Sequence, residues 1–194
     1  KPVLELGMPG AFDQHGIMPQ SCVRFEDGRI GLYYLGWSRQ VDIPYSNWTG
    51  LALSEDNGLT FRKAHAGPVL DRTSDEIYSA TGLFVVRNGD VFRGWYAMGL
   101  GWRTIENRLE ERYLITDTRS NDGIHWTRSG KPVLATKNEN EAMTRPSVIH
   151  HGSQWGMWYC KRSLTDFRDG KGSYRIGFAR SDDGDSWIRC DEEA

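Results

Sequence analysis

The chain has 194 residues and a net charge of −2 at pH 7, with acidic and basic residues interspersed along its length. This length is enough for one domain with a sizeable core. The balanced charge offers no basic stripe for nucleic acid and no polybasic patch for a membrane surface, so we expect neither partner. No apolar run approaches the ~18 residues that a membrane-spanning helix needs.

The three cysteines, Cys22, Cys160 and Cys190, are odd in number and lack the C-x-x-C spacing of zinc sites. We therefore expect no disulfide framework, no metal and no cofactor. The pair His150–His151 is predicted to lie at a turn beyond a strand, where metal ligation is not expected. The first ten residues, KPVLELGMPG, lack the layout of a signal peptide. The sequence thus predicts a cytoplasmic protein, or a secreted one if a leader has been removed.

Four short apolar or alternating segments make up the first third of the chain. They lie at 21–25, 30–37, 49–54 and 59–63, and are joined by EDG, a longer loop and EDNG. No helical periodicity extends beyond a turn or two. Asn, Asp and Gly tolerate the positive φ of tight hairpins, so these segments predict a four-stranded antiparallel sheet.

The same pattern recurs twice further along the chain. The repeated words are SEDNGLTF, SNDGIHW and SDDGDSW from Ser54, Ser120 and Ser181, GLYYLGWS, GWYAMGLG and GMWYCKRS from Gly31, Gly94 and Gly156, and PVL at Pro2, Pro68 and Pro132. Three independent words with one spacing, between sixty and seventy residues, indicate an internal repeat. The predicted units are approximately 1–66, 67–130 and 131–194.

One four-stranded sheet cannot bury both of its faces, and short four-stranded repeats stacked around an axis are typical of a β-propeller. We predict an all-β chain of three blades, with innermost strands near 18–25, 79–86 and 144–150. The aromatic residue of each fourth strand is expected to pack between blades; these residues are Phe61, Trp126 and Trp187. Three blades cannot close a ring. We expect the chain to be a piece of a longer propeller, the alternative being a six-bladed homo-oligomer of two copies joined through open blade edges.

The words ARSDDGDSW, TRSNDGIHW and TRPSVIHHGSQWGMWYCKRS resemble the five-bladed propellers of the glycoside hydrolase 43/32/68/130-related superfamily, particularly bacterial members associated with glycan metabolism. The resemblance implies that the chain holds three of five blades, that its partner is a carbohydrate, and that it hydrolyses or phosphorolyses a glycosidic bond. In that superfamily the innermost strands converge on a central funnel. Three carboxylates from the first three blades act there as base or nucleophile, pKa modulator and general acid.

Carboxylates just ahead of each innermost strand are therefore the catalytic candidates. Glycosidic cleavage needs one protonated carboxyl and one carboxylate, and a third carboxylate nearby raises the pKa of the acid. The sequence offers Asp13, Glu76 (with Asp75 as the neighbouring choice) and Glu141. Superfamily members commonly have Asp directly before Pro at the first strand, whereas Asp13 precedes Gln14. The alternative for each candidate is a solvent-facing loop carboxylate.

Five further residues are predicted to bind substrate. Arg145, in TRPSV, stands directly before an innermost strand, where its donor fork could hold sugar hydroxyls, a carboxylate or a phosphate. The other four are His15, Trp37, Trp102 and Arg162, of which the last three end second strands near the funnel rim. The alternatives are an ion pair for Arg145, a loop hydrogen bond for His15 and packing for the rest.

Two other functional classes stay open. The chain could be a non-catalytic propeller that binds a glycan or a protein through the same funnel. It could also be related to sialidases, because SEDNGLTF matches the Asp-box pattern S-x-D-x-G-x-x-aromatic. A sialidase also needs an arginine triad and a nucleophilic tyrosine, which the sequence does not clearly supply. In either family the turn carboxylates Asp56, Asp122 and Asp183 are expected to be structural.

Overall fold

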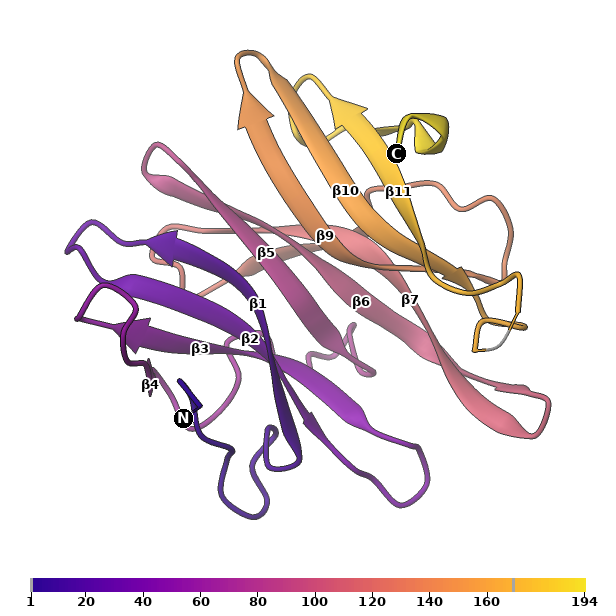
Figure 1. The fold of residues 1–194 in the computed structure, drawn as a ribbon, viewed down its shortest axis with the longest axis horizontal. Coiled ribbons are helices and arrows are strands. Elements are labelled where there is room, and N and C mark those ends of the chain that lie inside the picture. The colour runs from indigo at the N-terminus through magenta and orange to yellow at the C-terminus, as the bar shows by residue number, and fades with distance from the viewer. Residues whose placement is uncertain (1, 169) are drawn as a thin grey trace.

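The computed structural model describes residues 2–168 and 170–194, which form three four-stranded antiparallel blades (Figure 1). The first blade contains β1 (Gly16–Arg24), β2 (Ile30–Ser38), β3 (Ser46–Ser54) and β4 (Arg62–Lys63). The second contains β5 (Ala80–Asn88), β6 (Val91–Ile105), β7 (Arg108–Ser120) and β8 (Thr127–Pro132). The third contains β9 (Glu141–His151), β10 (Gln154–Ser163), β11 (Arg175–Ser181) and β12 (Ile188–Arg189). Within these ranges the only helix is a single 3-10 turn, Asp191–Glu193, so no helix could cross a membrane.

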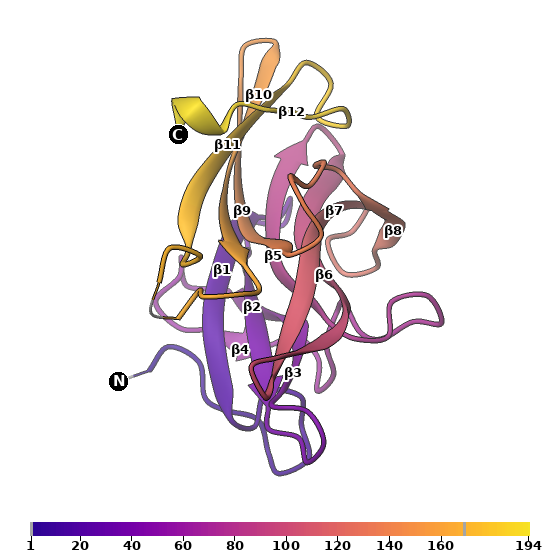
Figure 2. The same ribbon diagram turned by 90° about the vertical axis from the view of Figure 1, so that its right-hand side faces the viewer.

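Each blade pairs its strands in chain order, and the first strands of the three blades lie next to one another. β1 neighbours β5 and β5 neighbours β9, as the side view also shows (Figure 2). A single parallel bridge between Trp48 and Ala80 joins the first two blades into one sheet. These observations confirm the predicted all-β architecture, and β1, β5 and β9 overlap the three predicted innermost strands.

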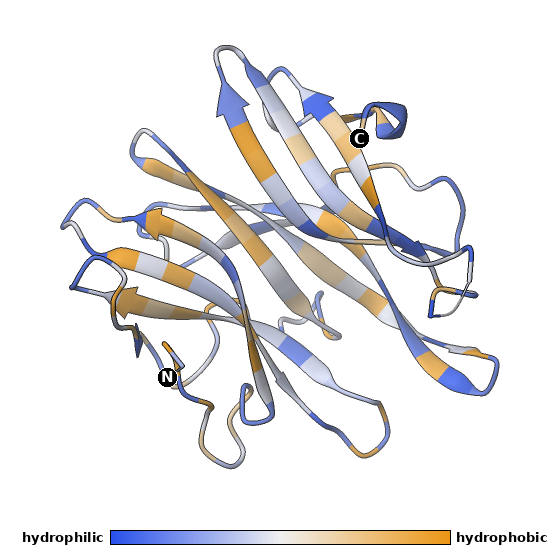
Figure 3. Ribbon diagram, in the orientation of Figure 1, coloured by the Kyte–Doolittle hydropathy of each residue, from blue (hydrophilic) through white to orange (hydrophobic). Residues whose placement is uncertain are grey.

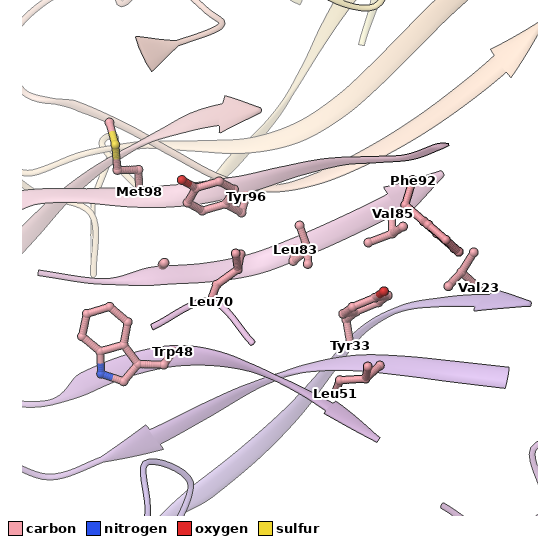
Figure 4. Close-up of a cluster of buried hydrophobic side chains, with 11 residues drawn as sticks. Val23, Tyr33, Trp48, Leu51, Leu70, Leu83, Val85, Phe92, Tyr96 and Met98 are labelled. Atoms are coloured by element: carbon pink, nitrogen blue, oxygen red, sulfur yellow. The ribbon is translucent and has the colours of Figure 1, made fainter. Parts of the chain in front are cut away.

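The core lies between blades, where apolar faces meet. Figure 4 shows side chains of the first blade, including Tyr33 and Leu51, facing Leu83 and Val85 of the second. A second cluster centred on Trp95 fills the space between the second and third blades. The fourth-strand tryptophans lie in these interfaces as predicted: Trp126 meets Tyr33 edge-on at 5.8 Å, and Trp187 meets Trp95 at 6.0 Å between ring centroids.

The turns that begin at the repeat serines Ser54, Ser120 and Ser181 share one hydrogen-bond pattern. In the first turn the Ser54 hydroxyl donates to Asp56 (2.7 Å), and the hydrogen bonds from Thr60 lower the pKa of Asp56 to about 2. The other two turns repeat this pattern with Ser120 and Asp122 and with Ser181 and Asp183. Both also contact the preceding blade: the Tyr33 hydroxyl donates to the Gly123 carbonyl (2.7 Å), and the Arg93 guanidinium donates to the Asp183 carbonyl (2.7 Å). The turn carboxylates are structural, as expected.

The far face of the third blade is apolar and uncovered. Trp158 occupies the position in β10 that Tyr33 has in β2 and Trp95 has in β6. Tyr33 and Trp95 are fully buried by the following blade, whereas Trp158 is 43% exposed. Other exposed apolar side chains of this face are Ile149, Ile176 and Ile188. Apolar residues elsewhere lie mainly along the strands, with polar residues in the loops (Figure 3).

The pair Trp95 and Trp158 therefore makes a matched test of blade packing. In the 194-residue chain, Trp95→Ala should reduce the free energy of unfolding by about 3–5 kcal/mol, because it leaves a cavity in an interface. Trp158→Ala should reduce it by about 1 kcal/mol or less. Urea denaturation followed by circular dichroism measures both, and equal losses would contradict this account of the core.

Candidate functional site

A cavity of about 310 Å³ lies where the N-terminal halves of the innermost strands meet. Each inner strand contributes two residues to its wall: Met18 and Gln20 from β1, Thr81 and Gly82 from β5, and Thr144 and Arg145 from β9. The wall is completed by Leu35, Tyr45, Asn47, Glu111, Tyr113, Cys160 and Tyr174. All three blades thus contribute to one concave, aromatic-rich site, which is the usual form of a small-molecule site.

Each inner strand is irregular at the height of this cavity. The register of β1 shifts between Pro19 and Ser21, that of β5 shifts beyond Thr81, and β9 shifts opposite the residues that follow Trp158. Such bulges bend a strand and re-aim its side chains. Gly82 and Arg145 occupy the corresponding positions of β5 and β9, and both have positive φ, 71° and 53°. The left-handed conformation costs an arginine roughly 1–3 kcal/mol and is concentrated at functional sites.

Glu111, at the start of β7, brings a buried carboxyl to the cavity. Glu111 is 2% exposed, and the Ser79 hydroxyl donates a hydrogen bond of 2.5 Å to its Oε1. Burial raises the pKa of Glu111 to about 7, while hydrogen bonding and the charge of Arg162 act in the opposite direction. A carboxyl with this pKa can both donate and accept a proton near neutral pH, which suits general acid or base catalysis.

Arg162 supports the wall from behind the cavity. It is 4% exposed, and its Nε donates to the Tyr113 hydroxyl (2.8 Å) while Nη2 donates to the main-chain carbonyl of Glu111 (3.0 Å). The Tyr113 and Tyr174 hydroxyls are joined by a 2.6 Å hydrogen bond. Arg162, predicted to bind substrate, is not among the described residues that line this cavity; it holds the Tyr113 side chain and the main chain of Glu111, both of which belong to the cavity wall.

The three predicted catalytic carboxylates each belong to a buried cluster of a different blade. Glu76, which is 3% exposed, accepts hydrogen bonds from the second-strand Tyr96 (2.7 Å) and the fourth-strand Arg128 (2.9 Å). In the first blade, Asp13 accepts a hydrogen bond from Tyr34 (3.0 Å) and pairs with Lys63 (2.6 Å). In the third blade, Glu141 accepts two hydrogen bonds from Arg189 (2.8 and 2.9 Å). Arg189 also donates to Asp191, which accepts a hydrogen bond from Tyr159 (2.6 Å). Each of the three blades therefore contains a buried cluster of a carboxylate, a tyrosine and a basic residue.

This placement differs from the expected convergence of Asp13, Glu76 and Glu141 with Arg145 in one funnel. The three carboxylates are not among the described residues that line the cavity, and Glu141 is not the solvent-facing loop residue that the sequence suggested. Asp75, the neighbouring choice, is exposed. Each of the three carboxylates forms an ion pair with a basic residue of its own blade, and removing one partner of such a buried ion pair typically costs about 3–5 kcal/mol of stability.

The predicted binding residues are distributed around the site. Arg145 lines the cavity, and it forms no ion pair with any residue that the structure describes. Trp102 lies one layer behind the wall, where its ring meets that of Tyr45 edge-on at 4.9 Å. His15 and Trp37 pack against each other at 6.3 Å and lie outside the described lining. No cluster of metal-ligating side chains occurs in the described part of the chain.

Glu111 lies in a third strand, away from the segments ahead of the innermost strands where the sequence predicted the catalytic carboxylates. A signal was present: the charged run Glu110–Arg112 interrupts the apolar pattern of the third strand in LEERYLIT. The repeat offered a second signal. Asn47, Tyr113 and Tyr174 stand at the same distance ahead of the repeat serines, and all three line the cavity.

With the fold and the cavity defined, comparison with known proteins identifies the class of fold. No protein-family model matches the chain. Two uncharacterized proteins of Mycobacterium tuberculosis, MT1551 of strain CDC 1551 and Rv1502 of strain H37Rv, are each 34% identical over 188 residues. This alignment covers 96% of the chain and 59% of each relative, so the chain spans little more than half the length of the curated proteins it matches.

Solved structures resemble the chain more broadly. A glycoside hydrolase has a TM-score of 0.70 at 18% identity, covering 94% of this chain and 57% of the other. A protein of the GH130 family, which contains mannoside phosphorylases and hydrolases of beta-1,2 mannosidic linkages, has a TM-score of 0.65 at 15% identity, covering 97% and 55%. A GH32 beta-fructofuranosidase of Bombyx mori, solved in complex with sucrose, has a TM-score of 0.61 at 19% identity, covering 83% and 33%. At these identities the likeness is one of fold: the chain is an all-β protein with the propeller fold of glycoside hydrolases.

The raised pKa of Glu111 predicts a specific pH dependence of stability. The folded-state pKa of about 7 lies above the usual value of 4.5. The protonated carboxyl therefore adds to the free energy of unfolding below pH 4.5, and this stabilisation is lost as the pH rises through 7. Its size is on the order of 3 kcal/mol. Glu111→Gln should abolish this decline, as measured by urea denaturation between pH 4.5 and 8. An unchanged decline in the variant would contradict the assignment.

Proposed function

We propose that the chain forms part of a glycoside-processing enzyme whose substrate binds in the central cavity and whose proton donor is Glu111. The observation that carries this proposal is a carboxyl that is buried in a cavity built by three blades and has a pKa near 7. The likeness to glycoside hydrolases in fold supports the reaction class. A protonated carboxyl can transfer its proton to the leaving oxygen of a glycosidic bond.

The surrounding residues suit a sugar. Tyr45, Tyr113 and Tyr174 offer ring faces and edges for stacking against a pyranose, and Asn47 and Thr144 can exchange hydrogen bonds with its hydroxyls. Ser79 and Arg162 hold Glu111 and its strand in place. Preorganised side chains of this kind reduce the cost of positioning the substrate.

Hydrolysis also needs a second carboxylate, and Glu111 is the single one among the described residues that line the cavity. We propose that further blades of a five-bladed ring supply it. Three blades of five would be three fifths of a ring, which agrees with the 59% of each relative that the chain matches. The uncovered Trp158 lies where the next blade would pack.

A non-catalytic, glycan-binding propeller is the second candidate. It is favoured by the ion pairing of Asp13, Glu76 and Glu141, which leaves one carboxyl in the cavity where glycoside cleavage uses two.

The adjacent residues Glu110 and Glu111 provide a matched pair of variants. In the full-length protein, Glu111→Gln should reduce turnover by about 10²–10⁴-fold, because the amide cannot transfer a proton. Glu110→Gln should change it only slightly, because Glu110 pairs with Arg168 (2.9 Å) away from the cavity. Turnover is measured on a panel of aryl glycosides with and without phosphate, and melting temperatures control for folding.

Three outcomes separate the candidates. Equal turnover in the two variants would contradict the role of Glu111. Glycan binding without turnover on any substrate would favour the binding protein. Loss of turnover in Glu141→Gln at unchanged stability would instead restore Glu141 as catalytic residue, against the structural role expected from its pairing with Arg189.

We also propose that the 194-residue chain self-associates through the far face of its third blade. An apolar sheet face that carries Trp158, Ile176 and Ile188 exposed at 43%, 63% and 71% favours contact with a second surface. Ile176→Lys should shift the population toward monomer and leave the far-ultraviolet circular dichroism spectrum unchanged. Light scattering at ~100 μM protein checks this, and a monomeric parent chain would contradict it.

A further inference from the structure

Arg145 presents a positive charge that the described part of the protein does not neutralise. Its side chain is exposed and lines the cavity, where Nη1 contacts the sulfur of Met18. Of the described carboxylates none forms an ion pair with it, whereas Arg128, for example, pairs with Glu76. A guanidinium in this situation is available to a ligand.

The backbone holds Arg145 in place at an energetic cost. Its φ of 53° lies in the left-handed region, whereas the equivalent position of β5 is a glycine, Gly82, with φ of 71°. Glycine adopts this conformation without strain. An arginine that is retained there indicates that its side chain, and not its backbone, is the useful feature of the position.

Two further donors in the cavity lack partners. The Thr81 hydroxyl belongs to a residue that is 8% exposed, and neither it nor the Gln20 amide nitrogen has a hydrogen-bond partner in the described structure. Buried polar groups are normally satisfied, so unpaired ones that line a cavity point to a ligand. Both residues line the same cavity as Arg145.

Other polar atoms of the cavity wall lie around an open point beside Gly82. A methyl group on Gly82 would lie 3.8 Å from the main-chain nitrogen of Arg145, 3.8 Å from Thr144 Oγ1 and 3.9 Å from Gln20 Oε1. Polar atoms of β1 and β9 therefore border a space that the absence of a side chain at position 82 of β5 leaves free.

We propose that Arg145, with Thr81 and Gln20, forms a subsite for an oxyanion: the carboxylate of an acidic sugar or a free phosphate. A guanidinium fork binds both groups through paired, charge-assisted hydrogen bonds, and the hydroxyl and amide add neutral donors. This proposal rests on the function proposed above, which places a sugar in the cavity, and it adds that the ligand carries a negative charge. The anion would lie within the cavity that holds Glu111, the group proposed to move the proton.

Isothermal titration of the full-length protein with glucuronate, glucose and inorganic phosphate tests this subsite directly. At least one of the two anions should bind about tenfold or more tightly than glucose. Arg145→Gln should weaken the binding of that anion by about tenfold or more and leave the affinity for glucose unchanged. Arg39→Gln, which removes an exposed arginine outside the cavity, should change neither.

Arg145→Gly separates binding from folding, because glycine relieves the strained φ. This variant should no longer bind the anion, and its melting temperature should not be lower than that of the parent protein. Preferred binding of glucuronate would identify an acidic sugar as ligand, and preferred binding of phosphate would identify free phosphate. Glucose binding as tightly as both anions, or anion binding that survives both Arg145 variants, would overturn the proposal.

The outcome is independent of the catalytic proposal. Glu111→Gln should reduce turnover by about 10²–10⁴-fold and retain anion binding, so a failure of catalysis leaves the subsite testable. Conversely, an intact enzyme that shows no anion preference would refute the subsite alone.

Discussion

The need to bury both faces of a short four-stranded sheet governs this structure. The first two blades solve it by packing the aromatic residue of their second strand against the next blade, at the tryptophan directly ahead of its fourth strand, as Tyr33 does with Trp126. The stacking brings the first strands of all blades side by side, and the cavity forms where they meet. On the third blade the corresponding residue, Trp158, stays partly exposed because no further blade of the described chain covers it.

Charge is distributed according to this packing. The carboxylates at the starts of the blades lie at or near blade faces, where burial without a partner would be costly, and each has a base and a tyrosine nearby. Glu111 is the contrast: it is as buried as Glu76, but Ser79 donates to it and no cation forms an ion pair with it among the described residues. Its proton affinity is therefore high, and its carboxyl differs chemically from the paired ones.

Arg145 is the opposite case of an unpaired cation, and it depends on the irregularity of the inner strands. A regular strand would send alternate side chains to the two blade faces and none along the funnel. The bulges at Pro19, Gly82 and Arg145 break this alternation at the same height in each blade. A repeat that is structural over most of its length thereby places three different residues, a proline, a glycine and an arginine, at its centre.

The sequence by itself determined the blade, because hairpin turns, strand alternation and the words around Ser54, Ser120 and Ser181 are local patterns repeated at one spacing. It also placed Arg145 at the cavity, since that residue directly precedes a recognisable strand segment. Only the tertiary structure decided which carboxylates are free. Whether Glu76 meets Arg128 across its blade, or Glu111 turns into a cavity shared by three blades, depends on contacts between residues distant in sequence. The pKa of a carboxyl is set by those contacts and by its burial, neither of which a local pattern contains.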